Sequence, residues 1–533
     1  MSHAPAHSTA LAQAGAWVER LRESLHARGV QTHISWVLLT DDFAWKIKKP
    51  VRLGFLDCRS RHAREHLCEE ELRLNRRLAP ELYLGVARIT GTPEQPGLDG
   101  AGPVLDHAVT MRRFPDGALL SERLAAGRLQ ATDIDQLARR LAEFHRQAPV
   151  AAVDAGLGTP ERVAGDLRAV VRRLAGSDPG FDAAPWREWV EQHASRMAAT
   201  WARRLREGFV REVHGDLHLA NLVDLDGDIT AFDAIEFDPA LRWIDVASDI
   251  AFAVMDLHAH GRPDLAMRLL DGWLSGTGDH GAVTVLRSYL VYRALVRALV
   301  RNLTVAPDRR TSESSTGAAP SARQYLDEAC RWRDGADPRL LITEGLPGSG
   351  KTWVTTQLLE RCGAIRLRSD VERKRLHGLA PADRSPSPPG QGLYTDTATA
   401  RVYEHLEHLA RDALQAGWPV IIDASFAQAA ARRRMRALAR SLQVPFAILR
   451  CEAPDAELRR RLQWRQTQGT DASDADAAVL AHARRTREPL APDEQAVALD
   501  AGSPPDVEEL ARRWRAHQGN DDEHELPSDR HHG

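Results

Sequence analysis

The sequence predicts an α+β two-lobed domain followed by an α/β domain with a doubly wound parallel sheet. Before residue 305, strand patterns come early and long helical patterns follow. After residue 337, short apolar strands alternate regularly with helices. Strands followed by helices are typical of α+β domains, whereas regular alternation indicates a parallel sheet with helices on both faces. A small, polar, Pro- and Gly-bearing stretch at 306–323 separates the two patterns and has the composition of a linker.

In the first half, two strands are expected at 34–39 and 43–48, around a Thr-Asp-Asp turn. Apolar residues then recur at helical spacing from Leu67 to Leu78. A further strand is expected at 104–112, before the long helices. In the second half, the expected strands are 340–344, 364–368, 420–423, 446–451 and 496–499.

Composition limits both the architecture and the class of protein. A length of 533 residues exceeds one ordinary core, and 43% hydrophobic with 27% charged residues is a globular balance. The net charge of −3 gives no overall attraction to nucleic acid or anionic membranes. The five cysteines form no CxxC pair, which predicts isolated thiols in a reducing cytosol. Neither a signal peptide nor a membrane span is expected, so the predicted location is cytoplasmic.

The predicted domain boundaries follow from these patterns. The first domain covers 1–305, the linker 306–336 and the second domain 337–515. A short helix at 324–332 is expected to lead into the second domain. Residues 516–533 are acidic and His-bearing with almost no apolar side chains, which predicts a disordered tail.

The second domain contains a phosphate-binding motif. An apolar strand ends at Glu344, a glycine-rich loop follows, and Thr352 opens a helix, which is the context that a P-loop requires. Glycines let successive backbone N–H groups turn toward one centre, and the helix N-terminus adds its positive dipole end. Lys351 would reach the β- and γ-phosphates of a nucleotide, and Thr352 would hold Mg²⁺. The candidate nucleotide-binding residues are Gly345, Pro347, Gly348, Ser349, Gly350, Lys351 and Thr352.

Two carboxylates are expected at the same edge of this sheet. Asp423 ends the strand at 420–423 and could hold a metal-bound water if that strand lies beside the P-loop strand. Asp370 follows the strand at 364–368, and Arg373 lies one helical turn later. Asp370 could accept the proton of an attacking hydroxyl, and Arg373 could orient an anionic acceptor. The alternative is a helix-capping aspartate with a surface arginine.

From about residue 339 to 510, the sequence resembles the small P-loop kinases related to polynucleotide kinase, gluconate kinase and zeta toxins. The resemblance rests on GLPGSGKT, on Ser369-Asp370-Val371-Glu372-Arg373 and on VIIDASF. It implies that Asp370 is the catalytic base and that the arginine-rich helix 459–465 is a mobile lid, although each single arginine could equally lie on a solvated face. No Asn-Lys-x-Asp guanine signature is present, so ATP is favoured. The acceptor implied is a hydroxyl compound, with a nucleic-acid end as one option.

A second motif lies in the first domain. His214, Asp216 and Asn221 have the H-x-D-x-x-x-x-N spacing of a kinase catalytic loop, and Asp233 ends a strand about a dozen residues later. In this chemistry Asp216 orients and deprotonates the acceptor hydroxyl, while Asn221 and Asp233 hold Mg²⁺ on the ATP phosphates.

The segments HGDLHLANL and FDAIEFDPALRWIDVASDIAF resemble the aminoglycoside phosphotransferases, which have a protein-kinase-like fold and act on small molecules. The resemblance spans roughly 36–302. It implies structural roles for Asp245 and Asp249 at an acidic helix start, and His214 is expected to brace the loop.

A nucleotide-binding lysine and its carboxylate partner are expected further upstream. Lys46 lies on the strand at 43–48, and Lys48 points the same way by strand alternation. Glu71 shares a helix face with the leucines at 67–78, with Glu70 as the other candidate and a plain charged surface as the alternative. No G-x-G-x-x-G precedes Lys46.

These observations predict an ATP- and Mg²⁺-dependent phosphotransferase with two nucleotide sites and a hydroxyl-bearing acceptor. In a first alternative, the N-terminal half is a catalytically silent domain that senses a ligand and regulates the P-loop domain. In a second, the P-loop domain is a regulatory ATPase without an acceptor. Resemblance to a family supports transfer to a small hydroxyl compound rather than to a particular drug.

Overall fold

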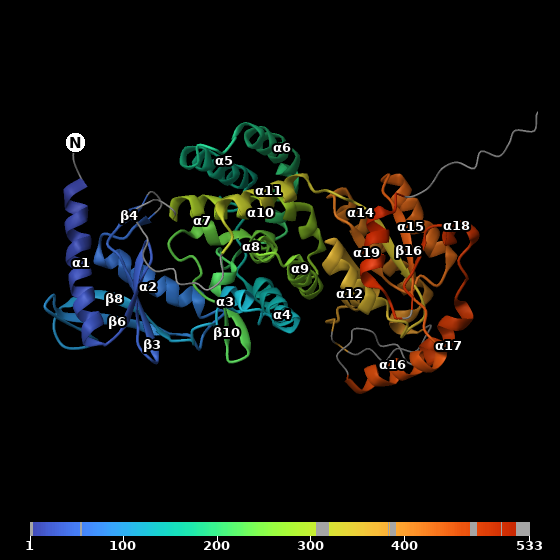
Figure 1. The fold of residues 1–533 in the computed structure, drawn as a ribbon, viewed down its shortest axis with the longest axis horizontal. Coiled ribbons are helices and arrows are strands. Elements are labelled where there is room, and N and C mark those ends of the chain that lie inside the picture. The colour runs from blue at the N-terminus through green and yellow to red at the C-terminus, as the bar shows by residue number, and fades with distance from the viewer. Residues whose placement is uncertain are drawn as a thin grey trace, which may run out of the picture. The chain divides into compact units, whose positions relative to one another are not determined.

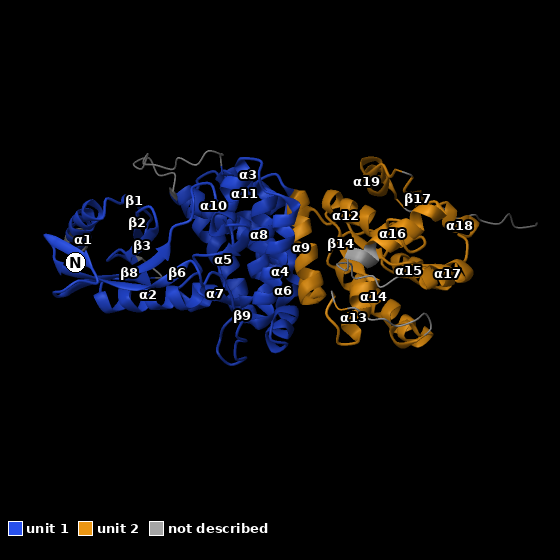
Figure 2. Ribbon diagram, turned by 90° about the horizontal axis from the view of Figure 1, so that it is seen from below, with its two compact units in different colours: residues 1–262, 285–332 blue, residues 263–284, 333–533 orange. Residues whose placement is uncertain are grey.

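The computed structural model describes residues 4–53, 56–304, 319–381, 383, 391–468, 477–502 and 504–518. Residues 306–318 of the predicted linker and 519–533 of the predicted tail lie outside these residues. The chain forms two compact units, coloured separately in Figure 2. Unit 1 comprises Met1–Arg262 and Val285–Trp332, and unit 2 comprises Pro263–Thr284 and Arg333–Gly533.

Unit 1 begins with an antiparallel sheet of six strands in the order β1-β2-β3-β8-β6-β7 (Figure 1). Helix α1 (Ala4–Ser24) packs Trp17 and Leu21 into the core formed with Trp36 and Ile47. Helix α2 (Arg61–Asn75) packs on β8. The strands are β1 (Arg28–Gln31), β2 (Ser35–Leu39), β3 (Phe43–Lys48), β6 (Tyr83–Thr92), β7 (Gln95–Leu98) and β8 (Val104–Arg112).

The three strands predicted in this sheet are confirmed, whereas β1, β6 and β7 were not predicted. The missed strand β6 begins with a bulge-like register shift between Tyr83 and Gly85, and its side chains alternate poorly between buried and exposed. A period of two is the main sequence signal of a half-buried strand, so an interrupted period hides it.

The rest of unit 1 is mainly helical, as expected. Helix α8 is buried along almost its whole length, which explains its apolar sequence. In the described part of the chain, no helix is both long and apolar enough to cross a membrane. The elements are α3 (Leu120–Ala125), α4 (Ala131–Gln147), α5 (Pro160–Ser177), α6 (Ala184–Arg206), β9 (Val210–Glu212), η1 (Leu219–Asn221), β10 (Leu222–Leu225), β11 (Asp228–Ala231), α7 (Pro239–Arg242), β12 (Trp243–Asp245), α8 (Val246–Ala259), α10 (Val283–Thr304) and α11 (Ala322–Asp334), besides the short pair β4 (Arg52–Leu53) and β5 (Leu56–Asp57).

Unit 2 is built on a parallel sheet of five strands in the order β14-β15-β13-β16-β17. All five predicted strands are confirmed: β13 (Leu340–Glu344), β14 (Ile365–Arg368), β15 (Val420–Asp423), β16 (Phe446–Arg450) and β17 (Ala498–Asp500). The central strand β13 is fully buried and pairs with β15 and β16, so the loop that follows it lies at the carboxyl edge where ligands bind in such sheets.

The helices of unit 2 include one segment from within the predicted first domain. Helix α9 (Pro263–Thr277) and the short helix η2 (His280–Ala282) group with the P-loop residues (Figure 2). The other helices are α12 (Lys351–Cys362), α13 (Ser369–Leu376), η3 (Gly392–Tyr394), α14 (Asp396–Gln415), α15 (Ala429–Ser441), α16 (Asp455–Gln468), α17 (Ala477–Thr486), α18 (Pro492–Gln495) and α19 (Val507–Ala516).

Candidate active sites

The loop between β13 and α12 follows a path that only glycine permits at several points. Gly345, Gly348 and Gly350 all have positive φ angles, of 151°, 85° and 97°. A Cβ on Gly345 would lie 2.3 Å from the carbonyl oxygen of Cys451. The loop therefore needs these glycines to turn its backbone N–H groups toward one centre.

Lys351 and Ser349 carry the polar side chains of this loop. The Lys351 amine donates to the carbonyl oxygens of Gly345 at 2.8 Å and Leu346 at 3.0 Å. Burial lowers the pKa of this amine, and the nearby carboxylates, chiefly that of Asp423, oppose the shift. The Ser349 hydroxyl is buried without a hydrogen-bond partner among the described residues. A cation and an orphan hydroxyl in a glycine loop fit a nucleotide phosphate chain.

The structure brings the predicted carboxylates to this loop. Because β15 pairs with β13, Asp423 lies at the same sheet edge as the loop, and its side chain is 6% exposed. Asp370 lies in the first turn of α13, close enough to influence the Lys351 amine. Thr352 lies in the first turn of α12. These three residues therefore lie on elements that meet at the loop, and their roles at Mg²⁺ and as a proton acceptor stay predictions.

Arg373 lies deeper than the sequence suggested. Its guanidinium donates to the Leu393 carbonyl at 2.8 Å and the Thr399 hydroxyl at 3.2 Å, and it lies 5.0 Å from the ring centre of Tyr394. The side chain therefore connects α13 to η3 and α14. Its predicted role in orienting an anionic acceptor stays a prediction.

The arginine-rich helix expected as a lid is α16, which packs on the P-loop. Leu458 and Leu462 form an apolar cluster with Leu346. A Cβ on Gly348 would lie 3.0 Å from the Leu458 carbonyl, and Arg461 donates to the Gly348 carbonyl at 3.2 Å. The side chain at position 465 lies outside the described residues.

One ion pair beside the P-loop was not predicted. The Arg487 guanidinium binds both carboxylate oxygens of Glu344, at 2.6 and 2.9 Å, and Glu344 is 1% exposed. This pair connects the segment after α17 to the residue that precedes Gly345. A glutamate at the end of a buried strand is a sequence signal for a cationic partner, since a buried carboxylate needs one.

In unit 1, the predicted lysine–glutamate pair forms between β3 and α2. The Lys46 amine lies 2.8 Å from Glu71 and also contacts Asp233. Burial lowers the pKa of Lys46, but Asp233 and Glu71 outweigh it and raise the pKa well above its usual value. Asp233 has a positive φ of 64° and a side chain that is 40% exposed. It therefore touches the lysine and still has an open side for a metal.

Lys48 forms a second buried pair that involves a residue missed by sequence reasoning. Its amine lies 2.5 Å from Glu71 and 2.5 Å from Glu236. Burial lowers the pKa of Lys48, and Glu236 and Glu71 raise it by more. Glu70, the other candidate partner, binds Arg242 at 2.8 Å instead. Two lysines therefore share Glu71, which holds α2 against the sheet.

The catalytic-loop residues lie together. The Asn221 amide donates to the Asp216 carboxylate at 3.0 Å and to the Asp216 carbonyl at 2.9 Å. His218 lies 3.4 Å from the same carboxylate. Burial raises the pKa of Asp216, but His218 and more distant cations lower it by a larger amount. The pKa of Asp216 therefore lies well below its usual value. Asp216 is thus a deprotonated carboxylate at neutral pH, which a proton acceptor requires.

Helix α8 holds this loop from behind. Asp249 accepts from the backbone N–H groups of His214 at 3.2 Å and Gly215 at 2.8 Å, and it binds His145 at 3.0 Å. The ring of His214 contacts the Phe232 carbonyl at 2.9 Å. These contacts agree with bracing roles for Asp249 and His214. Asp256, which was not predicted, accepts from the Leu219 N–H at 2.9 Å.

We expect Gly215→Ala to destabilise unit 1 by about 2 kcal/mol or more. The residue has a φ of 86°, and a Cβ would lie 2.7 Å from the backbone carbonyl of Leu241. Denaturant unfolding measures the change. Gly227→Ala is the matched control, because Gly227 has a φ of 92° but nothing within 4 Å, so only about 1 kcal/mol of backbone strain is expected. Equal losses in the two variants would contradict a close approach at Gly215.

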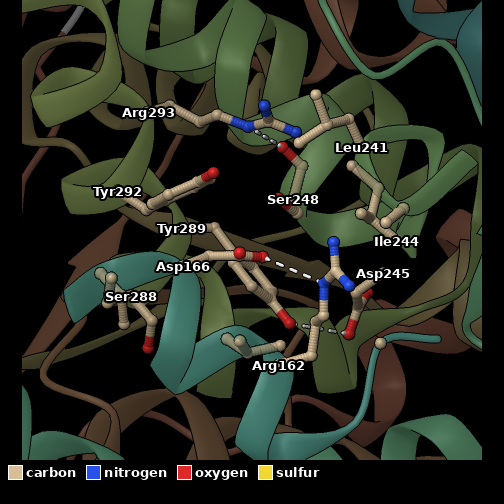
Figure 3. Close-up of a pocket in the computed structure, with 14 residues that line it drawn as sticks. Arg162, Asp166, Leu241, Ile244, Asp245, Ser248, Ser288, Tyr289, Tyr292 and Arg293 are labelled. Atoms are coloured by element: carbon tan, nitrogen blue, oxygen red, sulfur yellow. Dashed lines mark hydrogen bonds and ion pairs between the residues drawn. The ribbon is translucent and has the colours of Figure 1, made fainter. Parts of the chain in front are cut away.

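A cavity of about 40 Å³ lies beside this loop, between α5, the α7–β12 segment, α8 and α10 (Figure 3). Arg293 lines it and donates to the carbonyl of Gly215 at 3.1 Å, so one residue of the cavity lining also contacts the catalytic loop. Asp166 and Arg162, one turn apart on α5, form an ion pair at 4.0 Å in its lining, and burial raises the pKa of the Asp166 carboxyl. The remaining polar groups include Ser248, Ser288, Tyr289 and Tyr292.

A histidine that contacts the lining of this cavity should make the stability of the protein depend on pH. His193 lies 2.6 Å from the Ser288 hydroxyl, and burial lowers its pKa from 6.5 to about 4. In the unfolded chain, His193 is protonated below a pKa of 6.5, whereas in the folded chain it is protonated only below about 4. Stability should therefore fall as the pH falls through this window, by roughly 3 kcal/mol at most.

Denaturant unfolding of wild type and His193→Asn across this range tests the expectation. The variant should lose this part of the pH slope, and above about pH 7 the two proteins should differ by a constant amount. An unchanged slope in the variant would show that His193 is not the group responsible.

Comparisons with known proteins agree with this arrangement. Residues 340–490 match the family model described as an AAA domain. The chain is 31% identical over 455 residues to the uncharacterized protein Rv2004c of Mycobacterium tuberculosis, which covers 85% of this chain and 89% of that protein. The uncharacterized protein Mb2027c of Mycobacterium bovis matches to the same extent. The chain belongs to the family of these mycobacterial proteins.

Solved structures resemble each half of this family member. A gluconokinase from Sinorhizobium meliloti covers 34% of this chain and 90% of its own, with 17% identity and a TM-score of 0.24. A choline/ethanolamine kinase family protein from Mesorhizobium loti covers 60% of this chain and 94% of its own, with 11% identity and a TM-score of 0.36. The predicted combination of an α+β first half and a second half with a parallel α/β sheet is confirmed.

Proposed function

We propose that this protein is an ATP-dependent phosphotransferase with two nucleotide sites, each of which transfers the γ-phosphate to an acceptor hydroxyl. One observation carries the proposal. In each unit a lysine lies among carboxylates at the position where a sequence motif predicts phosphate binding: the buried Lys46 in unit 1 and the half-buried Lys351 in unit 2. Their surroundings match the division of labour in kinases between phosphate-binding, metal-binding and proton-accepting groups.

In unit 1, Lys46 would hold the nucleotide phosphates while Glu71 fixes its position. Asn221 and Asp233 would hold Mg²⁺, which when bound neutralises the charge that develops on the phosphates. Asp216 would orient the acceptor hydroxyl and take its proton on a carboxylate oxygen. The presence of Asp216, Asn221 and Asp233 together favours a catalytic unit 1 over a catalytically silent one.

In unit 2, the Lys351 amine and the N–H groups of the glycine loop would bind the phosphates, with Thr352 and Asp423 at the metal. Asp370 would take the proton of the acceptor hydroxyl. The contact between Arg461 and the P-loop supports α16 as the element that covers the nucleotide. This arrangement favours a transferase over a regulatory ATPase, because a candidate base lies beside the phosphate site.

The test is Mg²⁺-dependent transfer from γ-labelled ATP to a panel of acceptors. The panel spans polyols, amino alcohols, sugars, nucleosides, aminoglycosides and 5′-hydroxyl oligonucleotides. Wild type should label at least one acceptor through each unit. Labelling of no acceptor, with ATP hydrolysis intact, would instead favour the regulatory ATPase.

A further inference from the structure

Helix α9 lies in sequence between two helices of unit 1, yet it packs on the P-loop helix α12 of unit 2. Two ion pairs join these helices or their neighbours. Arg268 binds Glu360, in the last turns of α12, at 2.8 Å. Asp271 binds Arg366, on β14, through both carboxylate oxygens at 3.2 and 2.6 Å.

The second pair reaches the start of the P-loop helix. The remaining nitrogen of the Arg366 guanidinium donates to the Thr352 carbonyl at 3.3 Å and to the Thr356 hydroxyl at 2.6 Å. Arg366 is 6% exposed, so its charge needs a buried partner, and Asp271 supplies it. Through Arg366, Asp271 therefore holds the turn that carries Thr352.

The end of the same segment contacts α13, which carries Asp370. His280 lies 2.9 Å from Glu372, and Arg375 donates to the Ser275 carbonyl at 2.6 Å. A Cβ on Gly278 would lie 2.5 Å from the Arg375 guanidinium, so the backbone at Gly278 lies close against the Arg375 side chain. The segment thus contacts the helices that begin after both β13 and β14, the two places where the predicted metal-binding and proton-accepting residues lie.

We propose that the segment Pro263–Thr284 is a working part of the P-loop site, with Asp271 as a positioning residue for Thr352. The proposal rests on the proposed function of unit 2. The planar Arg366 guanidinium transmits the constraint, because it binds Asp271 with one edge and the Thr352 turn with the other. Partners behind a metal ligand commonly change metal-dependent binding by about 10- to 100-fold when removed.

The test is ADP binding to the full-length chain, with Mg²⁺ and with EDTA. All proteins carry Asp233→Asn to remove the metal carboxylate of unit 1. The readout is the dissociation constant in EDTA divided by the dissociation constant in Mg²⁺. This ratio measures how strongly the metal favours nucleotide binding. We expect Asp271→Asn to lower this ratio by about tenfold, whereas Asp271→Glu keeps the wild-type ratio. Arg268→Gln, at the opposite end of α12, is the matched control and should also keep it.

Arg366→Lys keeps the charge beside Asp271 but loses the two-edged contact, so it should lower the ratio even if Asp271→Asn fails to fold. A wild-type ratio in both Asp271→Asn and Arg366→Lys would overturn the proposal, as would an equal loss in Arg268→Gln. Lys351→Ala distinguishes failure of the proposed role of Asp271 from failure of the proposed nucleotide site in unit 2. If it leaves ADP binding unchanged, the proposed nucleotide site of unit 2 is wrong, whatever Asp271 does.

Discussion

Lys351→Met should reduce phosphate transfer by unit 2 on the order of 1000-fold. In the structure Lys351 is half-buried, and its amine donates to the Gly345 and Leu346 carbonyls within the loop. In the transition state it would instead stabilise the charge on the transferring phosphoryl group. Methionine preserves the length and the apolar stem while removing that charge. The initial rate of labelled-phosphate transfer to the acceptor of unit 2 measures the loss.

Lys374→Met is the matched control, because Lys374 is the other lysine of this unit. It is 2% exposed and donates to the Pro381 carbonyl at 3.3 Å, away from the glycine loop. Its loss should affect stability more than rate. If Lys374→Met slows transfer as much as Lys351→Met, general destabilisation rather than phosphate binding explains both results.

Asp216→Asn should reduce transfer by unit 1 on the order of 1000-fold, with little change in the apparent affinity for ATP. Asparagine keeps the shape of the side chain, and the neighbours Asn221 and His218 stay in place, but the proton acceptor is lost. Since the pKa of Asp216 lies well below its usual value, wild-type activity should show no acid limb from this group at pH values near 4 or above. A pH–rate profile with the acceptor of unit 1 tests this.

Asp226→Asn is the control for this charge change. Asp226 is exposed in the turn between β10 and β11 and has a φ of 53°, which asparagine also tolerates. It should transfer phosphate at the wild-type rate. A rate in Asp216→Asn equal to that of wild type would leave the N-terminal half as a silent ligand-sensing domain.

The two variants together decide whether the units are independent enzymes. If Lys351→Met and Asp216→Asn each abolish labelling of a different acceptor, both sites are catalytic. If only Lys351→Met has an effect, phosphotransfer belongs to unit 2 alone.

Local patterns were sufficient to predict much of each site. Strand alternation placed Lys46 and Lys48 on one face of β3, and helical spacing placed Glu71 toward them, because these periods depend only on backbone geometry. The strand-end position of Asp423 was enough to place it beside the P-loop once β15 paired with β13. For these residues, the position within a strand or helix was therefore sufficient to predict which side chains lie together.

Other contacts depend on where distant segments meet. Glu236 contacts Lys48 across 188 residues of sequence, so only the tertiary fold brings the two side chains together. The guanidinium of Arg373 contacts Leu393 and Thr399, which lie 20 and 26 residues away in the sequence. No periodic signal specifies such partners, because a long side chain can reach several of them.

The sequence by itself determined the two fold classes, all five strands of the parallel sheet, the phosphate-binding loop and the catalytic-loop motif. These features follow from periodicity and from short motifs whose chemistry is local. Only the tertiary structure decided that α9 packs on the P-loop helix and that Asp271 holds Arg366 against Thr352. Helix α9 is amphipathic wherever it packs, so its sequence specifies that one face is buried but not which helix covers it.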